Sequence, residues 1–271
     1  MTFIELVRSR RSVRTFDGSA LKPEDAEPIL NCADTAENPY AIPIEWRLLS
    51  AKKDGLSSPV IIGADTYIAG KLWPAPHAEE AFGYAFEEIV LFATSLGVGS
   101  TWMAGTLNRP AFERAMELRE GEIMPCVSPL GYAAPKMSLR ETVMRKGVKA
   151  DSRLDFGKLF FDGSFDKPLT QESAGILAEP LEAVRWAPSA VNRQPWRVVL
   201  DGKAAHFYEK KNRGYVSPSG WDLQKIDLGI ALCHFSRGMA EKGIRAEFVI
   251  DDPGLVTPQD TEYIASYVPA E

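Results

Sequence analysis

The chain has 271 residues, of which 45% are apolar and 10% are aromatic, and 31 Lys and Arg against 37 Asp and Glu give a net charge of −6. This composition is typical of a globular protein with a large core, which excludes a disordered chain. The acidic balance and the absence of any basic run longer than two residues argue against a nucleic-acid partner. The length fits one large domain or two of about 135 residues each.

Local patterns exclude further classes of protein. The longest apolar stretches, such as 89–93, are far shorter than the ~20 residues that span a bilayer. Residues 1–5 contain no basic region followed by an apolar one, so we expect no signal peptide and a cytoplasmic protein. The cysteines form no C-x-x-C pair and the histidines are scattered, so we expect no disulfide framework, no metal site and no histidine-based catalysis.

Helix and strand patterns alternate along the first half of the chain. We predict a short helix over 3–9 and a second helix from Pro23, with a bend or a later start at Pro28. Apolar residues at spacings of three and four predict a long helix over 79–96, which Gly97 ends. Strands are predicted over 46–50, 59–63 and 127–132.

A charged stretch over 136–153 separates this half from a second half in which the pattern begins again. Four echoes occur in the same order, at offsets of about 150 residues. They pair 16–17 with 165–166, 26–29 with 178–181, 45–49 with 195–199, and 83–98 with 229–244. Chance echoes in an α/β chain are the alternative, but the order favours a duplicated unit. We therefore expect a single unit over 1–271 made of two half-repeats, about 1–150 and 160–271.

Four segments carry residues suited to ligands, and each has a structural alternative. A basic turn after the first helix contains Arg10, Arg11, Ser12 and Arg14, whose guanidinium groups suit a phosphate or form a solvated turn. Residues 186–196 place polar side chains beside apolar walls, which fits a planar heterocycle or a capped helix end. Small residues in 97–105 allow a ligand, or only a neighbouring strand, to approach the backbone. Cations that follow the predicted strand at 127–132 include Arg140 and Arg145. Solvated linker charges are the alternative, which the sequence favours for Arg145.

These segments resemble motifs of the FMN-dependent nitroreductase family. The resemblance rests on Arg-Arg-Ser-Val-Arg-Thr-Phe at 10–16, Leu-Gly-Val-Gly-Ser-Thr-Trp-Met-Ala-Gly at 96–105, Leu-Gly-Tyr-Ala-Ala-Pro-Lys at 130–136 and Ala-Pro-Ser-Ala-Val-Asn-Arg-Gln-Pro-Trp at 187–196. In most members the last motif follows the first closely, whereas here it comes last. This order resembles a branch in which two nitroreductase-like halves are fused in one polypeptide.

The resemblance implies an α+β, nitroreductase-like fold that is internally duplicated, with helices packed around mixed or antiparallel sheets. Nitroreductases are homodimers with FMN at the interface, where one subunit supplies the basic turn and its partner supplies the Pro-Ser…Asn loop. Each piece is present once in this chain. The resemblance therefore implies one FMN per chain, a monomer that mimics a homodimer, and a degenerate second site.

The same resemblance assigns FMN-binding residues in both halves. The phosphate, ribityl chain and pyrimidine edge would be held by Arg10, Arg11, Ser12 and Arg14, with Arg140 or Arg145 closing on the phosphate. Ala104 and Gly105 would offer backbone N–H groups near flavin N5, and the other half would contribute Pro188, Ser189 and Asn192. Many members have an acidic residue at the position of Ala104, and the Asn and Lys that usually complete the site have no clear counterpart after Trp46.

The implied activity is ping-pong reduction of nitroaromatic, quinone or similar acceptors by NAD(P)H, in which flavin N5 carries the chemistry and no side chain is catalytic. Another flavin reaction of the superfamily, such as dehalogenation or flavin breakdown, is an alternative. A third reading is a non-catalytic protein that binds a flavin or another ligand.

Overall fold

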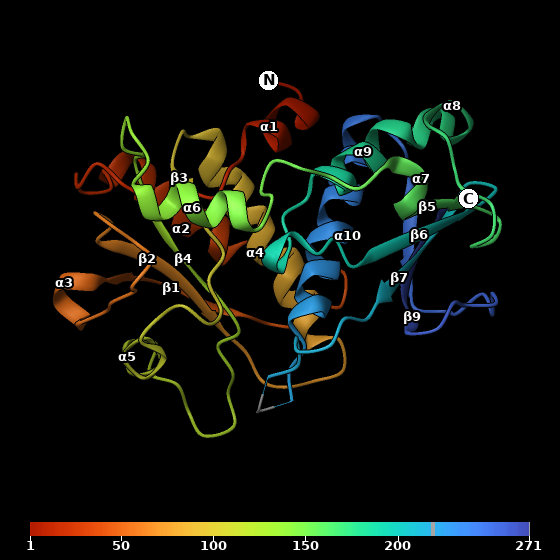
Figure 1. The fold of residues 1–271 in the computed structure, drawn as a ribbon. Helices are drawn as coiled ribbons and strands as arrows, with labels where there is room; N and C mark the ends of the chain where they lie inside the picture. Colours follow the sequence, from red (N-terminus) through yellow and green to blue (C-terminus); the bar gives the residue numbers. More distant parts are fainter. Residues whose placement is uncertain (218–219, 271) are drawn as a thin grey trace. The chain divides into compact units, whose positions relative to one another are not determined.

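The chain divides into two compact units in the computed structural model, which describes residues 1–217 and 220–270 (Figure 1). The N-terminal unit is Arg8–Ala150, and the C-terminal unit combines Met1–Val7 with Asp151–Glu271. The division at 150–151 falls inside the charged stretch 136–153. No helix in the described part of the chain is long and apolar enough to cross a membrane.

The N-terminal unit contains a four-stranded antiparallel sheet in the order β1-β2-β4-β3. Its strands are β1 (Glu45–Ser50), β2 (Thr66–Lys71), β3 (Gly99–Ser100) and β4 (Val127–Gly131). Its helices are α2 (Pro23–Asp34), α3 (Ala51–Asp54), α4 (Ala78–Ser95), α5 (Arg109–Ala115) and α6 (Leu139–Gly147). The first helix, α1 (Phe3–Ser9), crosses the division between the units.

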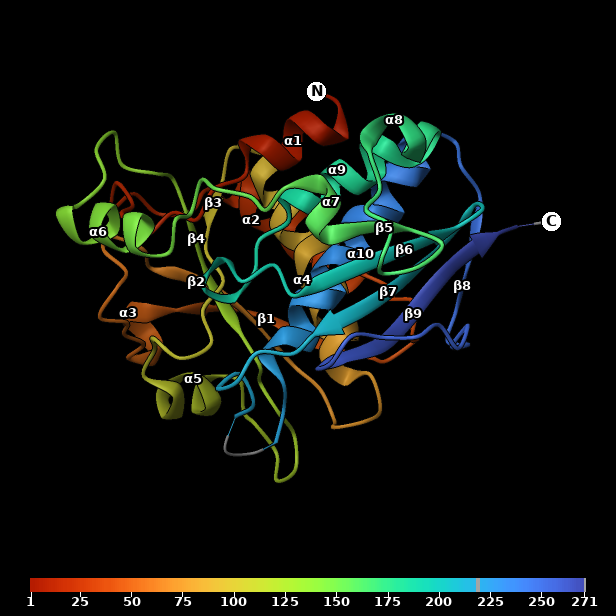
Figure 2. The ribbon, with the colours of Figure 1, turned by 45° about the vertical axis from the view of Figure 1, so that its right-hand side comes forward.

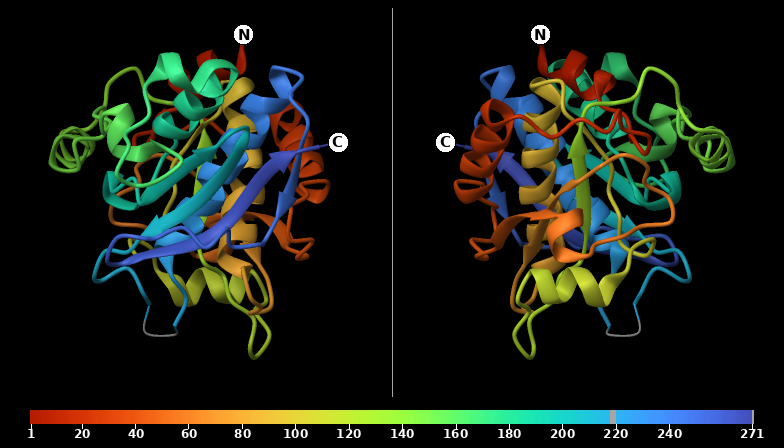
Figure 3. Two further views of the ribbon diagram at one scale, coloured as in Figure 1. Left: turned by 90° about the vertical axis from the view of Figure 1, so that its right-hand side faces the viewer. Right: turned by 90° about the vertical axis from the view of Figure 1, so that its left-hand side faces the viewer.

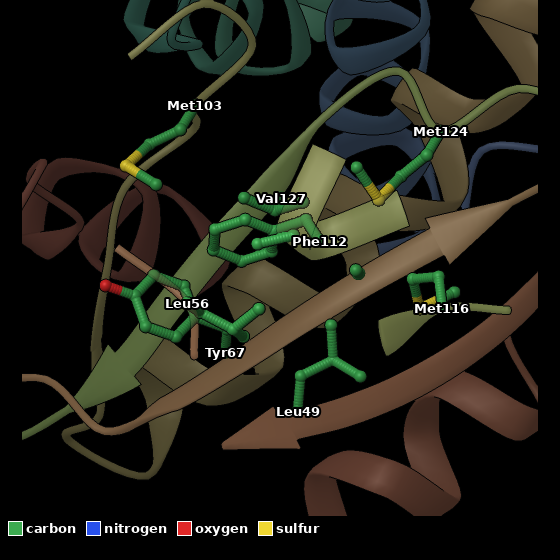
Figure 4. Packing of buried hydrophobic residues seen from close by; sticks show 10 residues of the cluster. Leu49, Leu56, Tyr67, Met103, Phe112, Met116, Met124 and Val127 are labelled. Carbon is green, nitrogen blue, oxygen red and sulfur yellow. The ribbon is translucent and has the colours of Figure 1, made fainter. Parts of the chain in front are cut away.

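Successive side chains of β1 and β2 point to opposite faces of the sheet, and each face packs into its own hydrophobic core. On one face Trp46 packs at a tilt against Phe82 and Phe86 of α4, with ring centroids 5.3 and 5.2 Å away, and α4 runs along this face (Figure 3). A Cβ on Gly70 would lie 2.3 Å from the Trp46 ring, so this close approach requires glycine. On the other face Tyr67 packs edge-on against Phe112 of α5 within a methionine-rich cluster (Figure 4).

The C-terminal unit contains a five-stranded sheet in the order β5-β6-β7-β9-β8, in which only β5 and β6 are parallel (Figure 2). Its strands are β5 (Phe160–Asp162), β6 (Trp196–Asp201), β7 (Ala204–Lys210), β8 (Ala246–Val249) and β9 (Thr261–Pro269). Its α-helices are α7 (Phe156–Leu159), α8 (Gln171–Ala174), α9 (Ala178–Trp186) and α10 (Leu223–Glu241). Two 3₁₀ turns are η1 (Gly175–Leu177) and η2 (Ala190–Asn192).

The two units follow the same plan. Taken in chain order, β1, β2, β3 and β4 correspond to β6, β7, β8 and β9, and both sets have the same neighbours in their sheets. The long helix follows the second strand of each set and ends in the same cap. Val98 donates to the carbonyl of Ala93 at 2.9 Å after Gly97, and Ile244 donates to that of Met239 at 3.0 Å after Gly243. Strand order, helix position and helix ending are thus common to both units.

Several predicted elements are confirmed, and two expectations are wrong: the strand over 59–63 and the later helix start at Pro28. The helices over 3–9 and 79–96 and the strands over 46–50 and 127–132 match α1, α4, β1 and β4 to within one residue at each end. Residues 59–63 form no strand, because only Ile62 pairs there, in an isolated bridge to Thr15. Helix α2 begins at Pro23 and continues through Pro28, so no later start occurs. The charged stretch contains α6, whose N-cap Ser138 accepts from the N–H of Glu141 at 3.1 Å.

The echo between 16–17 and 165–166 has no matching strand environment. Phe16 forms a bridge to Ala133, just after β4, whereas residues 165–166 lie in a turn after β5. The other echoes fall in corresponding elements, since 26–29 and 178–181 lie in α2 and α9, and 46–49 and 196–199 lie in β1 and β6. Three of the four echoes, including 83–98 and 229–244 in α4 and α10, therefore fall in corresponding elements of the two units.

Candidate functional site

The basic segment 10–16 is extended and lies along the edge of the N-terminal sheet, so it is not the turn expected. The N–H of Val13 donates to the carbonyl of Ser100 in β3 at 2.8 Å, and Ser12 forms a parallel bridge with Ser100. A Cβ on Gly99 would stand 3.0 Å from a methyl group of Val13, so glycine lets the segment approach β3. A cavity of about 230 Å³ opens beside it, with Arg11 in its wall.

Arg10 is the most buried cation of this segment. Its side chain is 9% exposed, and its Nε and Nη1 atoms have no hydrogen-bond partner among the described residues. Burial lowers the pKa of Arg10, nearby Glu87 raises it and Arg145 lowers it again. Because buried guanidinium groups ordinarily find acceptors, these free donors indicate a place for an anion.

Arg10, Arg14 and Arg145 form a cationic cluster. Burial lowers the pKa of Arg14, with Glu141 opposing the shift and Arg145 adding to it. Arg145 therefore lies close enough to influence both other arginines. The acidic partners of the cluster, Glu87 and Glu141, are themselves buried, with 0% and 1% of each residue exposed. The cluster thus combines three guanidinium groups with two carboxylates in a poorly solvated place.

Helix α6 is fixed to the basic segment at its N-terminus. The N–H of Ser138 donates to the hydroxyl of Thr15 at 3.1 Å, and Thr15 donates to the hydroxyl of Ser138 at 3.0 Å. In the first turn of α6, Glu141 lies 3.5 Å from Nη1 of Arg11. These contacts join 10–16 and α6, which places Arg145 beside the segment.

Arg140 lies apart from the cluster, although it belongs to the same helix. Its Nη1 donates to the carbonyl of Pro59, and it does not contribute to the pKa shifts of Arg10 or Arg14. The geometry therefore favours Arg145 over Arg140 as the additional cation. Ser12 is half-buried, and the nearby hydroxyls of Ser100 and Thr101 are buried without a hydrogen-bond partner in the described part of the chain.

Ala104 and Gly105 lie in the loop that follows β3. Met103 exchanges two hydrogen bonds of 2.9 Å with Val127, after which the chain leaves the sheet. No hydrogen bond between described residues uses the N–H of Ala104 or Gly105, and no atom lies within 4 Å of a Cβ built on Gly105. Nη2 of Arg109 holds the loop by donating to the carbonyl of Ala104 at 2.6 Å. The two N–H groups are thus available to a ligand.

Pro188, Ser189 and Asn192 lie in the C-terminal unit, in the loop that joins α9 to β6. Three residues of this loop other than glycine have positive φ angles, Val191 at 51°, Asn192 at 56° and Gln194 at 51°. Such angles are unfavourable, above all for β-branched Val191, and strained loops of this kind are common at functional sites.

Hydrogen bonds inside the unit hold this strained loop in place. The carboxylate of Asp227 accepts from the N–H of Ala190 at 3.0 and 3.1 Å, and the hydroxyl of Ser189 accepts from the N–H of Gln194 at 2.9 Å. The Asn192 amide donates to the carbonyl of Ser152 at 3.0 Å. Two of the three side chains assigned by resemblance therefore also fix the loop itself.

Glu87 and Asp227 were not predicted from the sequence. Both lie in long helices, α4 and α10, where a carboxylate between apolar residues is usually solvent-facing. Glu87 accepts from Nε1 of Trp102 at 2.9 Å, and Asp227 holds the strained loop. The flanking apolar residues Ile226 and Leu228 were the available signal for Asp227. In the described ranges, no group of three or more His, Cys, Asp or Glu could hold a metal ion.

Comparison with known proteins identifies relatives of this arrangement. A family model described as "Putative TM nitroreductase" matches residues 2–239. The chain resembles a putative nitroreductase from Thermotoga maritima with 21% identity and a TM-score of 0.64, over 99% of this chain and 94% of that one. This likeness shows a shared fold and confirms the expected α+β fold with helices packed on mixed and antiparallel sheets.

Two further solved structures match about half of the chain. A nitroreductase family protein from Clostridium difficile has 19% identity and a TM-score of 0.44, over 54% of this chain and 92% of that one. A nitroreductase with bound FMN from Bacteroides fragilis has 20% identity and a TM-score of 0.42, over 51% of this chain and 92% of that one. No curated protein matches the chain.

Proposed function

Because the chain belongs to the putative TM nitroreductase family, we propose that it is an FMN-dependent oxidoreductase that passes electrons from NAD(P)H to nitroaromatic, quinone or similar acceptors. The observation that carries the proposal is Arg10, whose buried guanidinium has two nitrogen atoms without a partner among the described residues. A buried charge of this kind is costly unless an anion completes it. The FMN phosphate is such an anion.

The residues of the basic segment fit the phosphate end of FMN. A phosphate dianion accepts several charged hydrogen bonds at once, and Arg10, Arg14 and Arg145 supply forked donors within one cluster. Arg11 and Ser12 belong to the same extended segment and would bind the ribityl chain and the ring edge. Arg140 remains a second candidate for the phosphate, although its bond to Pro59 makes Arg145 the better one.

Backbone and loop groups fit the ring. The unused N–H groups of Ala104 and Gly105 would donate to the polar edge of the isoalloxazine near N5. Pro188, Ser189 and Asn192 would cover the ring, in a loop that Asp227 already holds in shape. FMN supplies the exchange of two electrons when bound, and the chain's own groups bind, orient and electrostatically favour its reduced form. No side chain of the chain needs to act as an acid or base.

One complete site per chain follows if the two units descend from a duplicated ancestor. The shared strand order and the matching caps of α4 and α10 support this duplication into half-repeats of about 1–150 and 160–271. The basic segment belongs to the N-terminal unit, and the strained loop belongs to the C-terminal unit. We propose that one FMN takes residues from both units, so that a monomer mimics a homodimer.

Binding of FMN to an Arg10→Gln variant tests the proposal. Removing the charge of Arg10 should weaken FMN binding by about 2 kcal/mol, roughly 30-fold, because a charged hydrogen bond to the phosphate is lost. The affinity is measured by titrating the protein into FMN and following flavin fluorescence. Arg114→Gln, at an exposed position of α5, is the matched control and should leave the affinity unchanged. Equal affinities for the two variants would refute this placement of the phosphate.

Anaerobic reduction separates the enzyme from a non-catalytic flavin protein. The FMN-loaded protein should lose its visible flavin absorbance when NADH or NADPH is added without oxygen. The absorbance should then return when a nitroaromatic compound or a quinone is added. A protein that binds FMN but is bleached by neither nicotinamide would be a flavin-binding protein or a member with another flavin reaction.

A further inference from the structure

A second cavity, of about 420 Å³, lies entirely within the residues of the C-terminal unit. Val198 pairs with Phe207, which packs on Phe235 of α10, so the alternating residues Arg197 and Tyr208 point to the opposite face of the sheet. The cavity lies on this opposite face, and residues of α7, β5, β6, β7 and the start of β9 line it. Figure 2 labels these five elements.

The walls combine apolar surfaces with positive charge. Leu154, Phe161, Phe165 and Pro258 provide apolar surface, and the rings of Phe161 and Phe165 lie 5.4 Å apart. The charged groups in the wall are Lys158, Arg197 and Lys210, and none of the described residues that line the cavity is acidic. A cavity of this chemistry is complementary to an apolar body that carries a negative group.

Arg197 is the fixed cation of the cavity. Its Nη1 donates to the carbonyls of Gln194 and Trp196 at 3.0 and 2.6 Å, which holds the guanidinium in one orientation. Its Nε and Nη2 take part in no hydrogen bond, and its side chain in no ion pair, with the residues that the structure describes. Burial alone lowers the pKa of Arg197 to about 10. A largely buried guanidinium without a counter-ion favours the entry of an anion.

Lys210 supplies a second charge on the next strand. Lys210 follows Tyr208, the partner of Arg197, by two residues along β7, so both Lys210 and Tyr208 point to the same face. Lys210 pairs with Thr261 of β9, which also lines the cavity. Lys210 is exposed and makes no ion pair within the described ranges, whereas Lys158 is paired with Asp155 at 2.9 Å. One partly buried cation, Arg197, and one exposed cation, Lys210, therefore remain available to the same ligand.

We propose that this cavity binds small organic anions with an apolar body, of which an aromatic carboxylate is the simplest. The carboxylate accepts from the free side of the Arg197 guanidinium and is attracted by Lys210, while the ring packs among Leu154, Phe161 and Phe165. The site uses no residue assigned to FMN, so it does not depend on the proposed oxidoreductase activity.

Calorimetric titration with 2-naphthoate tests this site, with uncharged 2-naphthamide as the matched ligand. The folded protein should bind 2-naphthoate saturably at one site per chain, and should bind the amide at least about tenfold more weakly because it lacks the charge. Arg197→Gln keeps a donor for the two carbonyls but removes the charge, and should weaken binding of 2-naphthoate at least about tenfold. Lys210→Gln should weaken it about threefold.

Two control variants separate this site from others. Lys203→Gln, in the exposed turn between β6 and β7, and Arg10→Gln, in the N-terminal unit, should both bind 2-naphthoate as the unaltered protein does. Circular dichroism establishes that each variant is folded. If Arg197→Gln does not fold, Lys210→Gln and the amide decide the question. Absence of saturable binding, equal binding of acid and amide, or loss of binding in Arg10→Gln would each overturn the proposal.

Discussion

Buried charge is the feature of single residues that connects this structure to function. Arg10, Glu87, Glu141, Glu209 and Asp227 are all at most 9% exposed. Such groups are rarely retained in a core unless they are paired or used. Glu87 and Asp227 accept hydrogen bonds from Trp102 and Ala190, whereas Arg10 retains free donors. Arg10 is therefore the residue of this set whose buried charge a bound anion would stabilise.

Glu209 in β7 makes folding depend on pH. It is 0% exposed, and both carboxylate oxygens lack a hydrogen-bond partner among the described residues. Burial raises the pKa of Glu209 from 4.5 to about 7, with Asp222 adding to the shift and Lys211 and Lys225 opposing it. Between these two pKa values the folded state holds a proton that the unfolded chain releases, so stability falls as the pH rises.

Glu209→Gln should remove this dependence. The uncharged amide should raise the free energy of unfolding by about 2 kcal/mol at pH 8 and change it little at pH 4, where the carboxyl group is protonated in the folded state. Urea denaturation at the two pH values measures the effect. Glu247→Gln, on exposed β8, is the control and should leave the pH profile as it is. The interpretation fails if both variants lose stability equally between pH 4 and pH 8.

Among the helices and strands, the sequence predicts those whose apolar pattern lies within their own residues. The apolar face of α4 and the positions of β1 and β4 follow from their own residues. Strand β2 does not, because it ends in Gly70 and Lys71. The Lys71 ammonium is buried among partners distant in the chain: it lies 3.1 Å from Glu122 and 3.4 Å from Glu45. An ion pair between residues far apart in the chain cannot be predicted from the periodic pattern of apolar residues within one strand.

The residues of the candidate site likewise include some that the sequence predicts and some that it does not. The sequence resemblance indicated the basic segment and the strained loop, because both are contiguous motifs. It left Arg140 and Arg145 undecided, since the choice depends on how α6 is fixed to Thr15. It also left out Glu87 and Asp227, because each acts on residues of another element. Motif positions were predictable, whereas their supporting contacts required the fold.

Close packing of α9 and α10 gives a prediction for one element. A Cβ on Gly238 of α10 would lie 2.9 Å from the Cα of Pro180 in α9, so the helix backbones approach closely. Gly238→Ala should therefore destabilise the protein by about 1–3 kcal/mol, although alanine ordinarily favours helices. Thermal unfolding measures the change. Gly147→Ala in α6, where a Cβ meets no atom within 4 Å, should instead be neutral or stabilise by about 0.5 kcal/mol. A stabilising Gly238→Ala would contradict this packing.

At the level of the whole molecule, the two units share a strand order but differ in their candidate ligand-binding residues. Both have the same order of four strands and the same long helix, while the C-terminal sheet has the additional strand β5. The cationic cluster belongs to one unit, and the strained loop belongs to the other. The proposal of one flavin site for each chain rests on this division, since a symmetric pair of units would carry the same residues twice.

The ratio of bound FMN to protein, measured together with the molar mass in solution, decides whether each chain forms one complete flavin site. The FMN-saturated protein is passed through a size-exclusion column with light-scattering and absorbance detection. We expect one FMN per chain in a particle that contains one chain. A protein without bound flavin, a particle with two FMN per chain, or one FMN shared by two chains would contradict it.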